Sequence, residues 1–495
     1  MIRSILLGIL NLLLFSKILT AQSMPIYDIV LAGGRVIDPD SKLDAIRHVG
    51  INNGRIEMIS ITPLQGKEVV DVSGLVVSPG FIDMHIHGRT NTEQEYQVHD
   101  GVTTGLELEW GVEYPSKWYA FRQGKALINY GASVNWGFDR FRALTRFNGK
   151  LDSISMLAVR GEMQLENLFN FIRPSYSVSL NQEETAKAIN FMREDLTEGA
   201  VGIGLPIGYI PAASADELYQ VYKLSGETGA TIFTHVRDMG MLSIQEAIAD
   251  AALTGAPLHI VHINSMSLSQ IGLAITMVQD AQRKGFDITT EMYPYTAAST
   301  LLQSAIFNEG WREKLGMDYS DLQWVATGER LTKNTFDKYR AKGGTVIMHM
   351  MKPEWIRAGI ATKGTIIASD GMPNAPKAHP RTAGTFTRVL GKYVREEKAL
   401  TLDDAIAKMT ILPAKRLEGI SPMMHYKGRI QIGADADMTI FDLATVMDRS
   451  TFEEGLKFSE GIIHVLVNGK FVIRKGVTVP NVFPGQPIYG KYKRN

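Results

Sequence analysis

An apolar run near residue 80 ends in two histidines, and this run constrains the fold more than any other part of the chain. It reads Val77-Ser-Pro-Gly-Phe-Ile-Asp-Met-His-Ile-His87. If the run is a β-strand, His85 and His87 share one face at its carboxyl end, where two imidazoles can bind one cation. The alternative is a strand end that carries two surface histidines. The Pro-Gly pair and the buried-looking core of the run favour the first strand of an α/β barrel, whose ligands lie at strand carboxyl ends.

Further apolar runs recur along the chain, separated by helical patterns, which is typical of parallel βα units. We expect strands at 79–87, 103–109, 132–137, 200–205, 231–236, 257–263, 287–293 and 364–370. Eight such strands close a (β/α)8 TIM-type barrel, here predicted over 78–420. A ninth run, Thr345 to Met350, complicates the count and could displace one of the eight.

Both ends of the chain contain short alternating segments instead. Residues 26–75 hold several strand candidates between turn signals, among them Asn53-Gly54, and similar segments recur between Gly433 and Ile473. The amino-terminal set reads as an incomplete antiparallel sheet. We therefore expect 24–77 and 421–485 to form one composite β-sandwich outside the barrel.

The composition limits the partners and the compartment. The chain has 495 residues, 45% of them hydrophobic, with 52 basic and 52 acidic residues. This even charge indicates neither nucleic acid nor anionic lipid, so a small-molecule partner is expected, and an oligomer is possible. Residues 1–21 combine a short positive region with an apolar stretch too short to span a bilayer, which predicts a signal peptide and a periplasmic or secreted location, with an uncleaved anchor as the alternative. The sequence has no cysteine, which excludes disulfides and a lipid-modified cysteine.

Two more histidines end predicted strands, and they suggest where a metal would bind. His235 ends the strand at 231–236, and His262 ends the next. A single histidine at a strand end is more often a hydrogen-bonded core residue than a metal ligand. Together with His85 and His87, however, these residues would bring four imidazoles to one face of the barrel. Neutral imidazole is a good ligand for zinc. His259 lies an odd number of residues before His262, so it faces the other side as a core or supporting group.

The first run resembles the opening signature of the amidohydrolase superfamily, and later segments resemble its D-aminoacylase branch, the N-acyl-D-amino-acid deacylases. These segments are Thr234-His-Val-Arg-Asp238, Tyr293-Pro-Tyr-Thr296, Ser369-Asp-Gly371, His379-Pro-Arg381 and Met409-Thr-Ile-Leu-Pro-Ala-Lys-Arg416. The resemblance extends from about Asp28 to about Pro484. It implies a metal-dependent barrel joined to a sandwich built from both chain ends.

The chain departs from this branch at the metal site. The branch has a metal-binding cysteine after its second strand, where this chain carries Glu107 and Glu109 on one strand face. Carboxylate oxygens bind zinc and can bridge two cations, so we choose Glu109, nearer the strand end, as the replacement ligand. The alternative is that both acids only flank the site. The predicted fourth strand, Val201 to Pro206, has no lysine, which argues against a carboxylated-lysine bridge.

The resemblance also implies residues for catalysis and substrate binding. Asp370 matches the catalytic aspartate, which would move a proton between the attacking water and the leaving nitrogen, although a helix cap is its plainer role. Arg381 and Tyr293 or Tyr295 match positions that hold a substrate carboxylate, yet Arg381 could instead pair with a barrel acid.

Two further positions bear on the substrate. Asn264 stands where the branch has a lysine, which weakens the case for a free α-carboxylate in the substrate. Tyr209 lies in a loop after the fourth strand where the branch also has a tyrosine, so it is a pocket candidate.

We therefore predict a zinc-dependent hydrolase of non-peptide C–N bonds, most like an N-acyl-D-amino-acid deacylase. One or two zinc ions would be held by His85, His87, Glu109, His235, His262 and Asp370. A metal-bound hydroxide would attack the carbonyl while Asp370 shuttles the proton. The alternatives are a related enzyme acting on D-containing dipeptides, cyclic amides or lipid-like amides, and a metal- or ligand-binding relative without turnover.

Overall fold

The computed structural model describes residues 25–162, 165–372 and 377–494. The predicted signal peptide, residues 1–21, lies outside these ranges. Among the helices that they contain, none combines the length and the apolar character that crossing a membrane requires.

Eight parallel strands form the centre of the molecule and follow one another in chain order around the sheet. They are β6 (Phe81–Asp83), β7 (Val102–Val112), β8 (Asn129–Asn135), β9 (Ile203–Pro206), β10 (Ile232–His235), β11 (Leu258–Ile260), β12 (Ile288–Met292) and β16 (Ile366–Ile367). Each overlaps one of the eight predicted strands. The ring closes just beyond β6 and β16, where the amide of Asp370 donates to the carbonyl of His85 (2.8 Å) and that of His87 to Gly371 (3.0 Å). The predicted TIM-type barrel is thereby confirmed.

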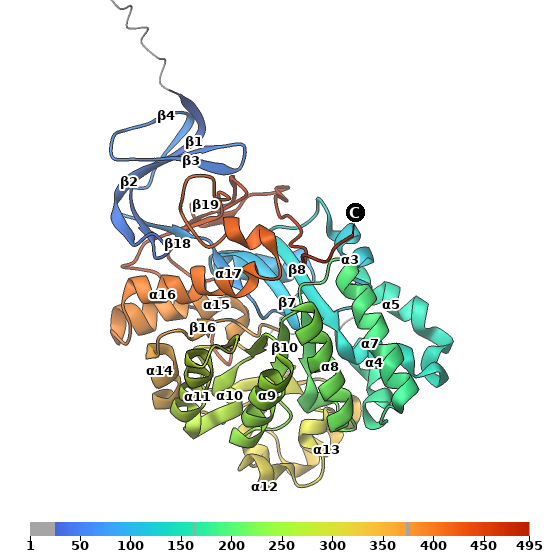
Figure 1. The fold of residues 1–495 in the computed structure, drawn as a ribbon. Coiled ribbons are helices and arrows are strands. Elements are labelled where there is room, and N and C mark those ends of the chain that lie inside the picture. The colour runs from blue at the N-terminus through green and yellow to red at the C-terminus, as the bar shows by residue number, and fades with distance from the viewer. Residues whose placement is uncertain (1–24, 163–164, 373–376, 495) are drawn as a thin grey trace, which may run out of the picture.

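Helices surround the barrel, as Figure 1 shows for α7 to α11. The helices are α2 (Asn91–His99), α3 (Pro115–Arg122), α4 (Trp136–Ala143), α5 (Leu151–Val159), α6 (Leu165–Ile172), α7 (Gln182–Thr197), α8 (Ala215–Thr228), α9 (Met241–Thr254), α10 (Ile263–Ser267), α11 (Ile271–Arg283), α14 (Pro353–Ala361), α15 (Arg381–Arg388), α16 (Leu402–Met409) and α17 (Ile411–Glu418). Local chemistry sets their ends. For α8, the Ser214 hydroxyl accepts from the amide of Glu217, and Gly229 ends the helix with a left-handed φ of 66°.

Strands from both chain ends join in one sheet beside the barrel (Figure 1). It contains β1 (Ile26–Asp38), β2 (Leu43–Asn52), β3 (Arg55–Ser60), β4 (Gln65–Asp71), β5 (Val76–Pro79), β17 (Met438–Phe441), β18 (Ile462–Val467), β19 (Lys470–Arg474) and β20 (Val477–Thr478). The junction is made by β5, which pairs in parallel with β1 and antiparallel with β17. Apolar side chains from both ends, such as Leu31 and Leu466, meet in one buried cluster. The predicted union of the two ends is confirmed, as one continuously hydrogen-bonded sheet.

A small insert between β12 and β16 accounts for the ninth apolar run. Thr345–Met348 forms β15 at the centre of an antiparallel sheet with β13 (Ala298–Leu301) and β14 (Leu322–Trp324). The insert also contains α12 (Trp311–Leu315) and α13 (Lys333–Lys342), at the bottom of Figure 1. Its own core includes stacked rings of Trp311 and Phe336, 5.3 Å apart. The ninth run therefore displaces none of the eight barrel strands.

Candidate metal centre

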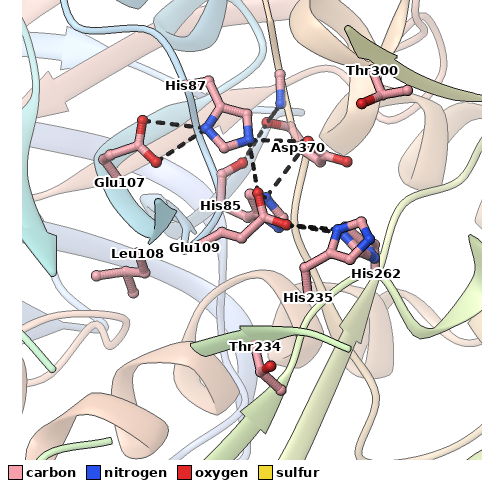
Figure 2. A network of polar contacts seen from close by, with 12 residues as sticks. His85, His87, Glu107, Leu108, Glu109, Thr234, His235, His262, Thr300 and Asp370 are labelled. Atoms are coloured by element: carbon pink, nitrogen blue, oxygen red, sulfur yellow. Dashed lines mark hydrogen bonds and ion pairs between the residues drawn. The ribbon is translucent and has the colours of Figure 1, made fainter. Parts of the chain in front are cut away.

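Six side chains converge at the carboxyl ends of the barrel strands (Figure 2). They are His85 and His87 beyond β6, Glu109 in β7, His235 at the end of β10, His262 after β11 and Asp370 after β16. All six are buried. These are the six metal ligands predicted from the sequence, and they come together because carboxyl ends of barrel strands share one rim.

The carboxylate of Glu109 lies between two pairs of histidines. Its Oε2 is 3.3 Å from Nε2 of His85 and 3.3 Å from Nε2 of His87. Its Oε1 is 3.0 Å from Nδ1 of His235 and 3.2 Å from Nε2 of His262. Each oxygen therefore faces one pair, which is the arrangement of a carboxylate that bridges two cations.

Two positions for a cation follow from this arrangement. We call the one bounded by His85 Nε2, His87 Nε2, Asp370 Oδ1 and Glu109 Oε2 the first position. Asp370 Oδ1 is 3.5 Å from Nε2 of His85 and 3.3 Å from Nε2 of His87. The second position is bounded by His235 Nδ1, His262 Nε2 and Glu109 Oε1.

The donor atoms of the first position fit zinc. Ligands of a tetrahedral zinc ion with bonds of about 2.0–2.1 Å lie roughly 3.3–3.4 Å apart, close to the distances around the first position. The Nε2 of His85 is buried and has no hydrogen-bond partner, as expected of an atom that binds a metal. Two groups of three residues each have their ligand atoms within 4.8 Å of one another. One group is His85, His87 and Asp370, and the other is His85, Glu109 and His262. A buried His/Asp/Glu metal site is therefore present.

The electrostatics of the cluster favour a cation. Burial lowers the pKa of His85, but the carboxylates of Asp370, Glu291 and Glu109 outweigh burial and raise it to about 10. Burial also raises the pKa of Asp370, yet Arg381 and His85 more than offset this and hold it below its ordinary value. The carboxylates are therefore ionised, and they attract positive charge.

Two of the six residues have unusual backbone conformations. His262 has φ of 34° and Asp370 has φ of 51°, both in the left-handed region that side chains other than glycine seldom adopt. Such backbone strain is concentrated at functional sites, where the surrounding fold maintains it.

Carboxylates also lie behind the first pair of histidines. Glu291 Oε1 is 2.5 Å from Nδ1 of His85, and Glu107 Oε1 is 3.0 Å from Nδ1 of His87. Glu291 additionally contacts Nε2 of His259 (3.1 Å), which places His259 in a supporting layer. The sequence interpretation missed Glu291. Its signal was an acid near the carboxyl end of the predicted strand 287–293, on the same strand face as Tyr293.

A largely apolar pocket lies next to the cluster. Its aromatic wall is formed by Trp110, Phe169, Tyr176 and Tyr209, and the ring of Tyr209 is 4.9 Å from that of His235. The insert adds residues 298–301, Ile306 and Met348. The pocket is therefore shaped by both the barrel loops and the insert.

The predicted substrate-binding residues divide into two groups. Tyr209 and Tyr293 line the pocket, and the hydroxyl of Tyr293 is buried without a hydrogen-bond partner. Asn264 lies behind Tyr293 and donates to its carbonyl oxygen (3.3 Å). Tyr295, the alternative to Tyr293, donates instead to Asp448 (3.2 Å).

Arg381 is fully buried and reaches the metal cluster. Its Nη2 is 2.7 Å from Oδ2 of Asp370, so it pairs with a barrel acid as one of the two sequence interpretations proposed. The guanidinium also lies over the ring of Tyr293, 4.6 Å from its centroid. Its Nε and Nη1 are buried and have no hydrogen-bond partner.

Comparison with known proteins agrees with this geometry. Residues 162–473 match the family described as the amidohydrolase family. A D-aminoacylase from Alcaligenes xylosoxydans xylosoxydans is 30% identical over 471 residues, which cover 91% of this chain and 95% of the relative.

Two solved structures share the fold at 24% identity, each with a TM-score of 0.77 and covering 94% of this chain and 100% of the other. One is an N-acyl-D-glutamate deacylase from Bordetella bronchiseptica complexed with zinc and a phosphonate inhibitor. The other is a D-aminoacylase described with a binuclear metal center. From the family match and the 30% identical relative, the chain belongs to the amidohydrolase family, as a metal-dependent member that resembles the N-acyl-D-amino-acid deacylases.

Proposed function

We propose that this protein hydrolyses the amide bond of N-acylated D-amino acids or close analogues, using zinc. The observation that carries the proposal is the Glu109 carboxylate between two histidine pairs, with Asp370 beside it and an apolar pocket alongside. The relatives named above act on this class of substrate. Their metal chemistry fits the donor atoms found here.

Zinc held by the six ligands would supply Lewis acidity, polarising the substrate carbonyl and making the attacking water more acidic. Asp370 is the group that moves the proton. Its Oδ1 faces the histidines and its Oδ2 is held by Arg381, so the carboxylate is fixed in position and ionised. It can therefore accept a proton from the water and return it to the leaving nitrogen.

The pocket suggests how the rest of the substrate is oriented. The hydroxyl of Tyr293 and the Nε and Nη1 of Arg381 are buried donors without partners. A substrate carboxylate or other acceptor would satisfy them, and leaving them unpaired costs free energy. The aromatic wall formed by Trp110, Phe169, Tyr176 and Tyr209 would take an apolar acyl group or side chain.

One observation favours a second candidate, an amide without a free carboxylate. The position of the family lysine is occupied by uncharged Asn264, and Arg381 already pairs with Asp370. An uncharged lipid-like or cyclic amide would need no additional cation in the pocket. The signal-peptide pattern of residues 1–21 supports a periplasmic or secreted location for either activity.

The decisive experiment is a hydrolysis panel with purified protein. N-acetyl and longer N-acyl derivatives of D- and L-amino acids should be compared with their esters and amides, with and without a chelator. We expect chelator-sensitive hydrolysis of D-configured acids. Preference for esters or amides would favour the second candidate, and full activity in chelator would exclude zinc-dependent hydrolysis.

A further inference from the structure

A second cavity lies behind part of the apolar wall of the active-site pocket. We call it the insert cavity, because it lies between the barrel loops and the insert, and its lining includes Ile207, Pro211, Ala305 and Leu315. Ile207 and Pro211 follow β9, whereas Ala305 and Leu315 belong to the insert. The barrel and the insert thus enclose a further space with apolar walls.

The insert cavity is close to the metal cluster. Four residues line both it and the active-site pocket: His235, Met239, Met266 and Ile306. One edge of the His235 ring faces Glu109, with Nδ1 3.0 Å from Oε1. The other edge lies against Gly208, a residue of the insert cavity, where an added Cβ would come within 2.8 Å of Cδ2. The two spaces are therefore separated by one imidazole ring and three apolar side chains.

The three apolar side chains of this partition can be displaced. Met239 and Met266 are unbranched and polarizable, so they repack at low cost. Met239 and Ile306 are also only half-buried, which leaves them room to move. A long flexible chain bound in the pocket can therefore extend past them into the insert cavity, whereas an acetyl group is too short to reach it.

The charged side chains on the rim of the insert cavity are already paired. Lys314 Nζ is 2.5 Å from Oδ1 of Asp238, and Arg237 Nη2 is 2.9 Å from Oε1 of Glu246. Paired charges offer little to an ionic ligand, while apolar walls gain free energy when an apolar group excludes water from them. The insert cavity therefore favours an apolar occupant.

We propose that the insert cavity binds the distal part of a long acyl chain, so that the preferred substrates carry a fatty acyl group and not a short one. This inference rests on the proposed function and narrows its substrate class. Of the two apolar parts of an N-acyl amino acid, the acyl group is the one that can be a long chain. Each methylene moved from water into apolar surroundings strengthens binding by about fourfold, and such remote binding energy raises kcat/KM.

A series of acyl lengths tests the proposal. The N-acetyl, N-octanoyl and N-dodecanoyl derivatives of one D-amino acid should be assayed with zinc-loaded protein, below the concentrations at which they form micelles. We expect kcat/KM to rise with chain length, by about two- to fourfold per methylene until the insert cavity is filled. A kcat/KM that does not rise with acyl length would overturn the proposal.

Ala305→Phe places a bulky ring in the insert cavity, because Ala305 lines this cavity and not the active-site pocket. The ratio of kcat/KM for the dodecanoyl substrate to that for the acetyl substrate should fall by about tenfold or more. Ala341→Phe is the matched control, at an exposed position of α13 in the same insert that lines neither space. It should keep the wild-type ratio.

Leu315→Gln is a second variant, which nearly keeps the size of the side chain but makes the wall of the insert cavity polar. It should lower the same ratio, and it remains informative if Ala305→Phe does not fold. A wild-type ratio in the folded variants would overturn the proposal, even though hydrolysis of N-acyl-D-amino acids itself stood.

Hydrolysis of no member of the series would instead overturn the proposed function. Calorimetric binding of dodecanoate then decides the insert cavity by itself. Binding to the wild type that Ala305→Phe or Leu315→Gln weakens, and that Ala341→Phe does not, would support an acyl-chain site. Absence of binding, or equal binding by all four proteins, would overturn it.

Discussion

Replacing Asp370 by asparagine should separate proton transfer from metal binding. Asparagine keeps the size and shape of the side chain and still offers an oxygen to Arg381, now 2.7 Å from Oδ2, but it cannot carry the proton. The backbone φ of 51° also suits asparagine, which tolerates the left-handed region better than most residues. The variant should therefore fold with the site intact.

The expected losses can be estimated from the contacts of Asp370. Removing a general acid–base group lowers kcat by roughly two to four orders of magnitude, equivalent to about 2.7–5.5 kcal/mol. A buried Arg381 without its charged partner costs stability as well. Breaking a buried ion pair costs about 3–5 kcal/mol, and because the asparagine oxygen keeps one hydrogen bond we expect a loss at or below the lower end.

The assay combines steady-state kinetics on the best substrate of the panel, zinc content and the melting temperature. Asp83→Asn is a suitable control, because Asp83 is a buried acid that accepts from the amides of His85 and Ser369 without facing either metal position. It should retain far more turnover than Asp370→Asn. A zinc-loaded Asp370→Asn protein with kcat within tenfold of the wild type would refute the proton-shuttle role.

Three further predictions follow. Glu109→Ala should lose bound zinc together with turnover, while Glu107→Ala should weaken zinc binding by about one to two orders of magnitude. If Glu107→Ala instead lost more zinc than Glu109→Ala, Glu107 would be the bridging carboxylate. Tyr293→Phe should raise KM about 3- to 10-fold, which corresponds to the loss of one neutral hydrogen bond to the substrate, and it should not lower the melting temperature. An unchanged KM would mean that the hydroxyl of Tyr293 does not contact the substrate. Burial lowers the pKa of His99, stacked on Phe458, from 6.5 to about 4. The unfolded chain therefore takes up the proton first, and stability is lost as pH falls from 6.5 to 4, by about 3 kcal/mol at most. His99→Asn should flatten this fall in melting temperature, and an equally steep fall would contradict the assignment.

The barrel was predictable because its strands are almost entirely buried and most of them are rich in apolar residues. The insert was not, since its strands have three or four residues and pair antiparallel across long loops. Ala298–Leu301 is half polar, so only Thr345–Met348 was visible as a strand candidate. Periodicity along a strand indicates which face is buried, but it does not identify the partner strand.

The convergence of the metal ligands was predictable from strand ends, whereas side-chain direction beyond those ends was not. Alternation holds only while the backbone stays extended, and it ends at His262, whose φ is 34°. Asn264, two residues later, lies in α10 and points to the carbonyl of Tyr293. A residue at the position of the family lysine can therefore lie behind the pocket wall, and only the structure could reveal this.

Glutamate in place of cysteine changes how the two metal positions are related. A single thiolate sulfur would have to serve both cations, whereas the two oxygens of Glu109 each face one histidine pair, at 3.3 Å on one side and 3.0–3.2 Å on the other. Glu109 therefore contributes one similar oxygen to each position and does little to favour either. The two positions differ instead in their remaining groups. Asp370 adds a ligand to the first position alone, and Glu107 and Glu291 support only its histidines.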